Sequence, residues 1–562
     1  MNSLSSSEAL RLLVLSIDGA DYRIIDLLMK RGDLPNLQKL AERGAWGPVR
    51  STIPPITPVA WTSFFTGKNP GKHGVFDWIS MDGGDVGTPV ASRRRASTMW
   101  RFLSQRGHGV GVFNVPCTYP PEHLSGFQVP GFDAPSLGPE DVYPERASRI
   151  IEEACGEYVF FPADPEIVRD PKIAQDHMEA IASILRGLLR EFPCDVCMAH
   201  MHLLDWAHHY VLAGEMRPGD VSSLDLNGYV VRAYRLVDES VGALVGEWAS
   251  PDTNVVVVSD HGGELVDRLV NLEKLFLDHG LLAYTSAKTQ EAASIESGRR
   301  HARAAVRLWT AVKRASPGFA RLIAPLARAM RTRVSAYQVD AVVDWPRTAA
   351  VPWGNYGQIR LNIQGRDPRG IVPPEDVPAL TARIRELILS VADPISGSPV
   401  YMDVVPGSAL YTGPYAPEGP DLVALPVDDR YLSVSGRMLP GYVAPLLDVQ
   451  EQVVVELTEP RGSHSQVGVL FMAGPGVQQM TCLPESNLTD FAPTALYLLD
   501  EPIPKDMDGS PILAAIEPEV LAARPVRWGE PLPTDDTAGD TTVYTEEERR
   551  KIEEHLRSLG YL

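Results

Sequence analysis

The sequence predicts an α/β sandwich in which a mainly parallel central sheet is flanked by helices. Two observations predict it: short apolar runs that are rich in β-branched residues and bounded by Gly, Pro or Asp, and helical stretches between those runs. Such runs are typical of strands buried on both faces of a parallel sheet, and regular alternation of strand and helix is typical of an α/β fold. In these sheets, reactive groups gather beyond the carboxyl ends of the strands.

The predicted elements follow one another along two stretches of the chain. The strands are expected at 12–18, 110–115, 196–201, 255–260 and 467–474. The helices are expected at 22–43, 58–66, 97–107, 171–191 and 228–249. Residues 10–284 and 446–520 are therefore predicted to form one discontinuous core domain.

Three further regions depart from this alternation. Residues 298–333 carry ten Lys or Arg and no acid, with apolar residues at helical spacing, so 285–345 is predicted to be a basic helical insertion. Short strand-like runs and turns predict a smaller, β-rich α+β lobe at 346–445. Residues 521–562 are predicted to be a tail that ends in a charged helix.

Charge and composition exclude several classes of protein. The 562 residues have a formal net charge of −20, which disfavours nucleic acid as a partner because phosphate backbones attract basic surfaces. No run of about 18 apolar residues occurs, and no basic segment precedes a long apolar run at the N-terminus. We therefore expect a cytoplasmic protein, and we consider peripheral contact with a membrane through 298–333 an open alternative.

Asp and His side chains follow two of the predicted strands. Asp18 ends the first strand and precedes Gly19, where the backbone must turn. Asp260 and His261 come directly after four consecutive valines. Polar groups at the end of a buried strand are costly without partners, and coordination of a metal ion would supply such partners.

Three more residues extend this set. Asp205 and His209 are four residues apart, so a helix places both side chains on one face. His464 lies in a Gly/Ser-rich segment, expected to be a loop, immediately before another predicted strand. Three carboxylates and three imidazoles suffice for two divalent cations, and mixed nitrogen and oxygen ligation favours zinc, with manganese or iron as alternatives. The predicted ligands are Asp18, Asp205, His209, Asp260, His261 and His464.

Thr57 is the candidate nucleophile. It precedes Pro58 and an apolar helix, which is the pattern of an N-cap threonine followed by proline at the first helical position. The N–H groups of that first turn and the helix dipole are expected to form an anion site suited to a phosphoryl group. A nearby dication lowers the pKa of a hydroxyl, so Thr57 could act as an alkoxide.

The order of these motifs resembles the alkaline phosphatase superfamily, in particular its type I phosphodiesterase/nucleotide pyrophosphatase branch and, within that branch, the bacterial predicted phosphohydrolase/phosphomutase group. The segments that carry the resemblance are LSIDGAD, TPVAWTSFFTGKNPGKHGVFDW, FNVPCTYPP, HLLDWAHH, SDHGGE, NYGQIRLNIQGRDPRGIV, RGSHSQVGVLFMAGPG and EERRKIEEHLRSLGYL. The resemblance implies an alkaline-phosphatase-like fold and a small-molecule phosphate ester as substrate. It also implies that Asp205, His209 and His464 hold one metal ion. The second ion would be held by Asp18, Asp260, His261 and Thr57.

The chain departs from the resembled family at one position. Nucleotide pyrophosphatases place an asparagine about twenty-one residues after the nucleophile, where this sequence has Trp78, preceded by Asp77. Asn114 or backbone N–H groups are candidates to replace it. Further candidates for contact with the substrate are Lys68, Lys72, His73, Trp78 and Arg366.

The hypothesis from these residues is a two-step, in-line phosphoryl transfer through a phosphothreonine on Thr57. A sulfatase is disfavoured, because that branch needs Cys or Ser in a C/S-x-P-x-R context, which TPVAW lacks. A phosphomonoesterase or a phosphomutase would use the same core and stays an alternative. A non-catalytic scaffold that binds anionic lipid through 298–333 is a weaker alternative, since the ligand set and the threonine are intact.

Overall fold

The chain folds into two compact units. The computed structural model describes residues 10–79, 89–156, 158, 160, 169–284, 343–435, 452–532 and 544–558. The first unit comprises residues 1–265, 411–419 and 460–555, and the second comprises residues 266–410, 420–459 and 556–562. These boundaries differ from the sequence prediction. Among the described residues, 266–284 and 452–459 belong to the second unit, whereas 411–419 and 521–532 belong to the first.

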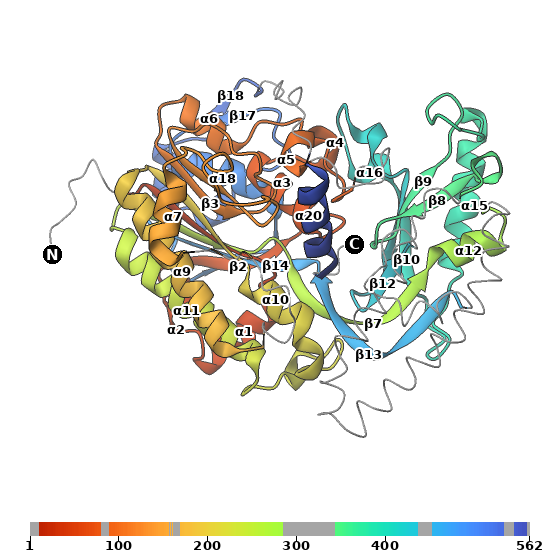
Figure 1. The fold of residues 1–562 in the computed structure, drawn as a ribbon, viewed down its shortest axis with the longest axis horizontal. Coiled ribbons are helices and arrows are strands. Elements are labelled where there is room, and N and C mark those ends of the chain that lie inside the picture. Colours follow the sequence, from red (N-terminus) through yellow and green to blue (C-terminus); the bar gives the residue numbers. More distant parts are fainter. Residues whose placement is uncertain are drawn as a thin grey trace. The chain divides into compact units, whose positions relative to one another are not determined.

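A nine-stranded sheet forms the centre of the first unit, with strand order β15-β2-β14-β6-β1-β5-β3-β4 and β16 paired to β2 (Figure 1). Pairing is parallel from β4 through to β6, and β14 runs antiparallel to both β6 and β2. The strands are β1 (Leu12–Ile17), β2 (Gly44–Arg50), β3 (Val110–Val115), β4 (Gly126–Pro130), β5 (Val196–Met201), β6 (Asn254–Val258), β14 (Val467–Ala473), β15 (Thr481–Cys482) and β16 (Ser486–Asn487). The predicted mixed α/β architecture with a largely parallel sheet is confirmed.

The five predicted strands are all present, and each is buried along nearly its whole length. β2 and β4 were not predicted. Their sequences, GAWGPVR and GFQVP, contain Gly and Pro, which are depleted in strands, so composition alone gives no strand signal.

Helices cover both faces of this sheet (Figure 1). One face carries α1 (Tyr22–Arg31), α2 (Pro35–Arg43), α7 (Ala147–Cys155), α9 (Pro171–Glu191) and α11 (Tyr229–Trp248), and the other carries α3 (Thr57–Thr66), α6 (Met99–Gln105) and α18 (Phe491–Leu498). The predicted helix at 22–43 is in fact two helices. Gly32 ends α1 in the left-handed conformation, with φ of 79°, and Pro35 then begins α2.

Shorter elements complete the first unit. They are α4 (Pro70–His73), α5 (Val90–Arg93), α10 (Leu203–Tyr210), α19 (Pro518–Ala523), β17 (Ile503–Pro504) and β18 (Trp528–Gly529). The charged C-terminal helix that the sequence predicts is present as α20 (Glu546–Ser558).

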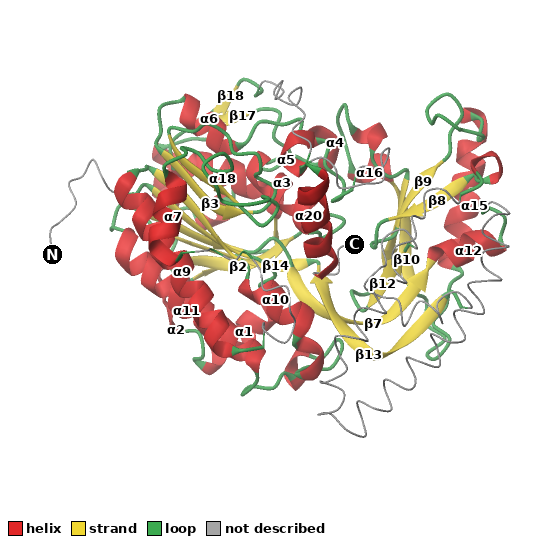
Figure 2. Cartoon of the chain, in the orientation of Figure 1, coloured by secondary structure: helices red, strands yellow, loops and turns green. Residues whose placement is uncertain are grey.

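The second unit has its own sheet and core (Figure 2). A four-stranded antiparallel sheet has the order β10-β11-β9-β8, and a three-stranded sheet has the order β12-β7-β13. The elements are β7 (Gly262–Asn271), α12 (Leu272–Asp278), β8 (Ala350–Trp353), β9 (Gln358–Leu361), α15 (Val377–Leu389), β10 (Tyr401–Pro406), α16 (Gly407–Leu410), β11 (Leu422–Pro426), β12 (Tyr431–Val434) and β13 (Val454–Ser465). β7 and β13 each continue from one unit into the other along the chain.

The predicted basic insertion lies outside the described residues, except for 343–345. The stretch 298–333, on which the membrane alternative depends, is therefore not described. Among the helices that are described, none combines the length and the apolar character needed to cross a membrane.

Candidate metal centre

The predicted ligands come together at one edge of the nine-stranded sheet. Asp18 directly follows β1, and Asp260 comes two residues after β6 ends. Asp205 lies in α10, which begins two residues after β5. These three strands are parallel neighbours, so their carboxyl ends lie at the same edge. Because β14 runs antiparallel to β6, His464, just before β14, reaches this edge as well.

His464 differs from the sequence prediction in one respect. It belongs to β13 and not to a loop, because residues 454–465 continue as a strand up to Ser465. The Gly and Ser residues around it are strand residues that allow close packing. A Cβ at Gly462 would lie 1.8 Å from the carbonyl oxygen of His208, which no side chain could tolerate.

Asp205, His209 and His464 form the first ligand group. His209 Nε2 lies 3.2 Å from Asp205 Oδ1 and 3.2 Å from His464 Nε2, and His464 Nε2 lies 3.5 Å from the same carboxylate oxygen. Asp205 and His464 are buried, and His209 is nearly so. Three ligand atoms at these separations could share one metal ion.

Asp18, Asp260 and His261 form the second group. His261 Nε2 lies 3.3 Å from Asp18 Oδ1 and 3.3 Å from Asp260 Oδ2. All three residues have no exposed surface. Asp18, Asp205 and His261 also meet as a possible ligand set, so the two groups are adjacent.

Backbone carbonyls fix the tautomer of all three imidazoles. The Nδ1 atoms of His209, His261 and His464 lie 3.1, 3.0 and 2.7 Å from the carbonyl oxygens of Gly462, Gly262 and Pro55. A carbonyl only accepts, so each Nδ1 carries a hydrogen, and in the neutral form of each ring the lone pair is on Nε2, which faces the carboxylates. Histidines that bind metal ions typically donate their other ring N–H to a neighbouring acceptor in this way.

The electrostatics of this site favour a bound cation. Burial, together with the charges of Asp18 and Asp205, raises the pKa of Asp260 well above its ordinary value. Burial lowers the pKa of His261 to about 3, so its Nε2 lone pair faces two carboxylate oxygens. Four atoms are buried and make no hydrogen bond within the described part of the chain: Asp18 Oδ1, Asp205 Oδ2, Asp260 Oδ2 and His261 Nε2. A divalent cation would satisfy such a set, and the donors suit zinc.

Two anchors on the segment around Thr57 place it beside these groups. Two residues earlier, the carbonyl of Pro55 accepts from His464. One helical turn later, Trp61 Nε1 donates to Asp18 Oδ2 at 3.3 Å. Thr57 is completely buried and is the first residue of α3, with Ile56 as the N-cap. The helix therefore starts one position earlier than the sequence predicts.

The sequence predicts free N–H groups in the first turn of α3, and this prediction is wrong for two of them. The N–H groups of Val59 and Ala60 both donate to the carbonyl of Ile56. Pro58 has no N–H group to offer. A phosphoryl group at Thr57 would therefore depend on metal ions and side chains more than on the first turn of the helix.

The backbone of Gly19, next to Asp18, closely approaches the backbone of Asp205. Gly19 has φ of +72°, and a Cβ added there would lie 3.1 Å from the Cα of Asp205. We expect Gly19→Ala to destabilise the fold by about 1 to 3 kcal/mol, because alanine is strained at this φ and crowds Asp205. Thermal unfolding and metal content would check it. Gly32→Ala is the control, with φ of +79° and open space around it; equal metal loss in both variants would contradict a specific role of Gly19.

The sequence prediction missed two histidines at this centre. His200, in β5, places Nε2 at 3.4 Å from Asp18 Oδ2. His202, the N-cap residue of α10, places Nδ1 at 3.0 Å from the same oxygen and Nε2 at 3.4 Å from Asp205 Oδ2. Both sit in MAHMHLLD. His202 lies just beyond the carboxyl end of a predicted strand, so the rule that identified Asp18 and Asp260 could have identified it, whereas His200 lies inside the apolar run.

Two of the predicted substrate contacts lie close to the metal centre. Asn114 is buried at the end of β3, with φ of 62°, and donates to the carbonyl of His200 at 3.1 Å. Trp78 packs against Phe132 with ring centroids 5.6 Å apart, and Phe132 packs against His202 at 4.9 Å. Asparagine tolerates the positive φ found at Asn114 better than most residues do. A role of Asn114 or Trp78 in substrate binding stays a prediction.

The other predicted substrate contacts are engaged elsewhere. Lys68 and Lys72 follow α3 and pair with Asp506 and Asp508. His73 is buried, with Nε2 2.9 Å from Ser63 Oγ. Lys68 and Lys72 follow the C-terminal end of a ten-residue helix whose first residue is Thr57, and a helix of that length spans about 15 Å. In the second unit, Arg366 pairs with both Asp367 and Asp421.

Asp77, next to Trp78, provides a pH-dependent prediction. Burial raises its pKa to about 7, from an ordinary value of 3.8. The folded protein therefore holds this proton more tightly than the unfolded chain does, and the stability it contributes below about pH 4 is lost as pH rises through 7. Asp77→Asn keeps the acceptor for the N–H of Trp78 but has no charge to bury. We expect its melting temperature, relative to wild type, to rise from pH 5 to pH 8; a constant difference would contradict this.

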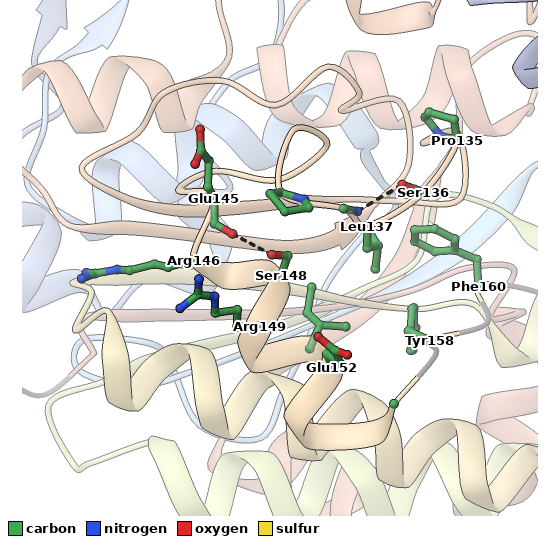
Figure 3. Close-up of a pocket in the computed structure, with 14 residues that line it drawn as sticks. Pro135, Ser136, Leu137, Glu145, Arg146, Ser148, Arg149, Glu152, Tyr158 and Phe160 are labelled. Atoms are coloured by element: carbon green, nitrogen blue, oxygen red, sulfur yellow. Dashed lines mark hydrogen bonds between the residues drawn. The ribbon is translucent and has the colours of Figure 1, made fainter.

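A cavity of about 980 Å³ lies beside α7 in the first unit. Two arginines, Arg146 and Arg149, line it together with apolar side chains that include Leu137 and Phe160 (Figure 3). In this close-up, Ser148 at the start of α7 donates to the carbonyl of Glu145. None of the site residues predicted from the sequence lines this cavity.

Comparison with known families gives a match over most of the chain. The family model described as type I phosphodiesterase/nucleotide pyrophosphatase matches residues 12–465, from β1 to the end of β13. No curated protein matches the chain. The matched segment includes all six predicted metal ligands and Thr57.

Proposed function

Because the chain belongs to the type I phosphodiesterase/nucleotide pyrophosphatase family, within the alkaline phosphatase superfamily, we propose that it hydrolyses phosphodiesters or nucleotide pyrophosphates with two divalent metal ions and Thr57 as nucleophile. The family consists of metal-dependent phosphoryl-transfer hydrolases that act on small-molecule phosphate esters. The observation that carries the proposal is the convergence of the Nε2 atoms of three histidines on three buried carboxylates, beside the start of α3.

Asp205, His209 and His464 would hold one ion, and Asp18, Asp260 and His261 would hold the other together with Thr57. The donor set suits zinc, with manganese or iron as alternatives. When bound, such ions supply positive charge that stabilises the oxygens of a phosphoryl group and lowers the pKa of a coordinated hydroxyl.

The protein's own contribution is to position the nucleophile. The anchors at Pro55 and Trp61 hold the first turn of α3 against the ligand groups. Thr57 Oγ1 loses its proton and attacks phosphorus, the P–O bond to the leaving group breaks, the departing oxygen takes up a proton, and a phosphothreonine forms. Water then attacks this ester, which releases phosphate or a monoester and returns the hydroxyl to Thr57. Proximity and fixed charge supply most of the acceleration in reactions of this kind.

A pair of aryl phosphates tests the diesterase assignment. The purified full chain would be loaded with Zn²⁺, and in a parallel sample with Mn²⁺, and release of the aryl alcohol would be measured. We expect kcat/KM for a bis-aryl phosphate to exceed that for the aryl monoester by at least about tenfold. A tenfold preference for the monoester would overturn the diesterase assignment in favour of a phosphomonoesterase or a phosphomutase. Absence of hydrolysis of both esters with either metal would contradict the enzyme assignment.

A further inference from the structure

A third cluster of possible metal ligands adjoins the two groups described above. It consists of Asp18, His200 and His202, which are 0%, 1% and 2% exposed. Of these, only Asp18 belongs to the ligand set that the sequence predicts. Its carboxylate faces two ways: Oδ1 points to His261, and Oδ2 points to the two additional histidines.

The spacing of this cluster fits a tetrahedral metal site. Asp18 Oδ2 lies 3.0 Å from His202 Nδ1 and 3.4 Å from His200 Nε2, and the two nitrogens are 3.4 Å apart. Ligands bound to zinc at about 2.0 to 2.1 Å in a tetrahedron are about 3.3 to 3.4 Å from one another. The first group, at 3.2 to 3.5 Å, has the same spacing.

The tautomer of His200 leaves a lone pair available for a cation. When Ser16 Oγ donates its hydrogen to the carbonyl of Ala199 at 3.3 Å, it accepts from His200 Nδ1 at 3.1 Å. The hydrogen of the neutral ring is then on Nδ1, and the Nε2 lone pair faces Asp18 Oδ2 and His202 Nδ1. The other three histidines of the centre show the same division, with Nδ1 fixed by a neighbour and Nε2 directed inward.

The second nitrogen of His202 is consistent with Nδ1 acting as a ligand. If Nδ1 binds a cation, the ring hydrogen lies on Nε2, which is 3.4 Å from Asp205 Oδ2. The ring would then link the third cluster to the first ligand group. In the opposite tautomer, Nδ1 donates to Asp18 and the lone pair of Nε2 is directed at the Asp205 carboxylate, which is repulsive.

We propose that Asp18, His200 and His202 bind a third divalent cation, with the Asp18 carboxylate bridging it to the second ligand group. Two imidazoles and one carboxylate favour zinc or another transition metal over Mg²⁺ or Ca²⁺, which prefer oxygen ligands. Trp61, whose Nε1 donates to Asp18 Oδ2, packs edge-on against the His200 ring at 5.0 Å and so supports two members of the cluster. The inference concerns a binding site and does not depend on which phosphate ester is the substrate.

Metal content measures this directly. The full chain would be saturated with Zn²⁺, desalted, and its zinc counted by mass spectrometry against protein concentration. We expect three zinc ions per chain in the wild type and two in His200→Gln, a loss of one third. His177→Gln is the matched control and should keep three. His177 is buried 4.7 Å from the Trp206 ring, as centroids, but belongs to no cluster of possible ligands in the described part of the chain.

Two zinc ions in the wild type, or an unchanged count in His200→Gln, would overturn the proposal in favour of a hydrogen bond from His202 to Asp18. If His200→Gln does not fold, anomalous diffraction at the zinc edge from wild-type crystals decides the matter, since a third peak between Asp18 and His202 is either present or absent. Peaks at the other two groups alone would remove this site and leave the proposed function intact. Three peaks in a protein that hydrolyses no phosphate ester would support this site and contradict the proposed function.

Discussion

Replacing Thr57 by alanine is expected to reduce hydrolysis of the preferred phosphate ester by at least about a thousandfold. The variant keeps the buried charges and the bound metal ions but lacks the oxygen that forms the covalent intermediate. Nucleophile variants of hydrolases generally retain a small residual rate, because charge stabilisation and substrate binding survive. Metal content should remain that of the wild type, since each ligand group has at least three other members.

Two further variants distinguish chemistry from packing at this position. Thr57→Ser keeps a hydroxyl and should retain measurable turnover. Thr62→Ala removes an equally buried threonine from the same helix, and Thr62 Oγ1 makes no hydrogen bond within the described residues. We expect Thr62→Ala to stay within about tenfold of the wild-type kcat. Turnover in Thr57→Ala above a tenth of the wild-type value would remove Thr57 from the role of nucleophile.

The parts of the fold that depend on local pattern were predictable. A buried parallel strand needs a continuous apolar run, so β1, β3, β5 and β6 were visible in the sequence. Polar residues at the ends of such runs, among them Asp18 and Asp260, were informative because burial without a partner is costly. The i,i+4 spacing of Asp205 and His209 needed only a helix, which α10 supplies.

Other features depend on tertiary contacts that sequence spacing does not encode. β2 is built from GAWGPVR, and it exists as a strand because β14 pairs along its whole length. Residues 411–419 pack with the first unit although the flanking residues fold with the second. Neither feature can be predicted from the local sequence, because the partner strand or the packing surface comes from a distant part of the sequence.

Some features of the metal centre could not be predicted from the sequence for a similar reason. Which ring nitrogen carries the hydrogen in His209, His261 and His464 is set by the carbonyls of Gly462, Gly262 and Pro55, and these carbonyls face the rings only after folding. His200 was overlooked because, in VCMAHM, a histidine inside an apolar run looks like an ordinary core residue. Its significance comes from β1, which brings Asp18 to the end of the neighbouring strand.

The second large effect is expected at Asp205. Asp205→Asn has nearly the same shape as the wild-type side chain but replaces a charged oxygen 3.2 Å from His209 Nε2 and 3.5 Å from His464 Nε2 with a neutral amide. Two imidazoles and a neutral amide form a much weaker site for a dication than two imidazoles and a carboxylate. We expect the variant to bind one zinc ion fewer and to lose at least about a thousandfold in kcat.

Asp238→Asn is the matched control for this change. Asp238 is 1% exposed, and its carboxylate accepts from the N–H groups of Asn36 and Leu37 at the start of α2. The single amide oxygen of an asparagine, placed as Oδ1, can accept from both N–H groups, so metal content and turnover should remain close to wild type. Because both variants remove a buried charge, a common loss of folding stability cannot explain a difference in zinc content between them. If Asp205→Asn keeps the full complement of zinc, Asp205 is not a ligand, and the first group has to be assigned to other side chains.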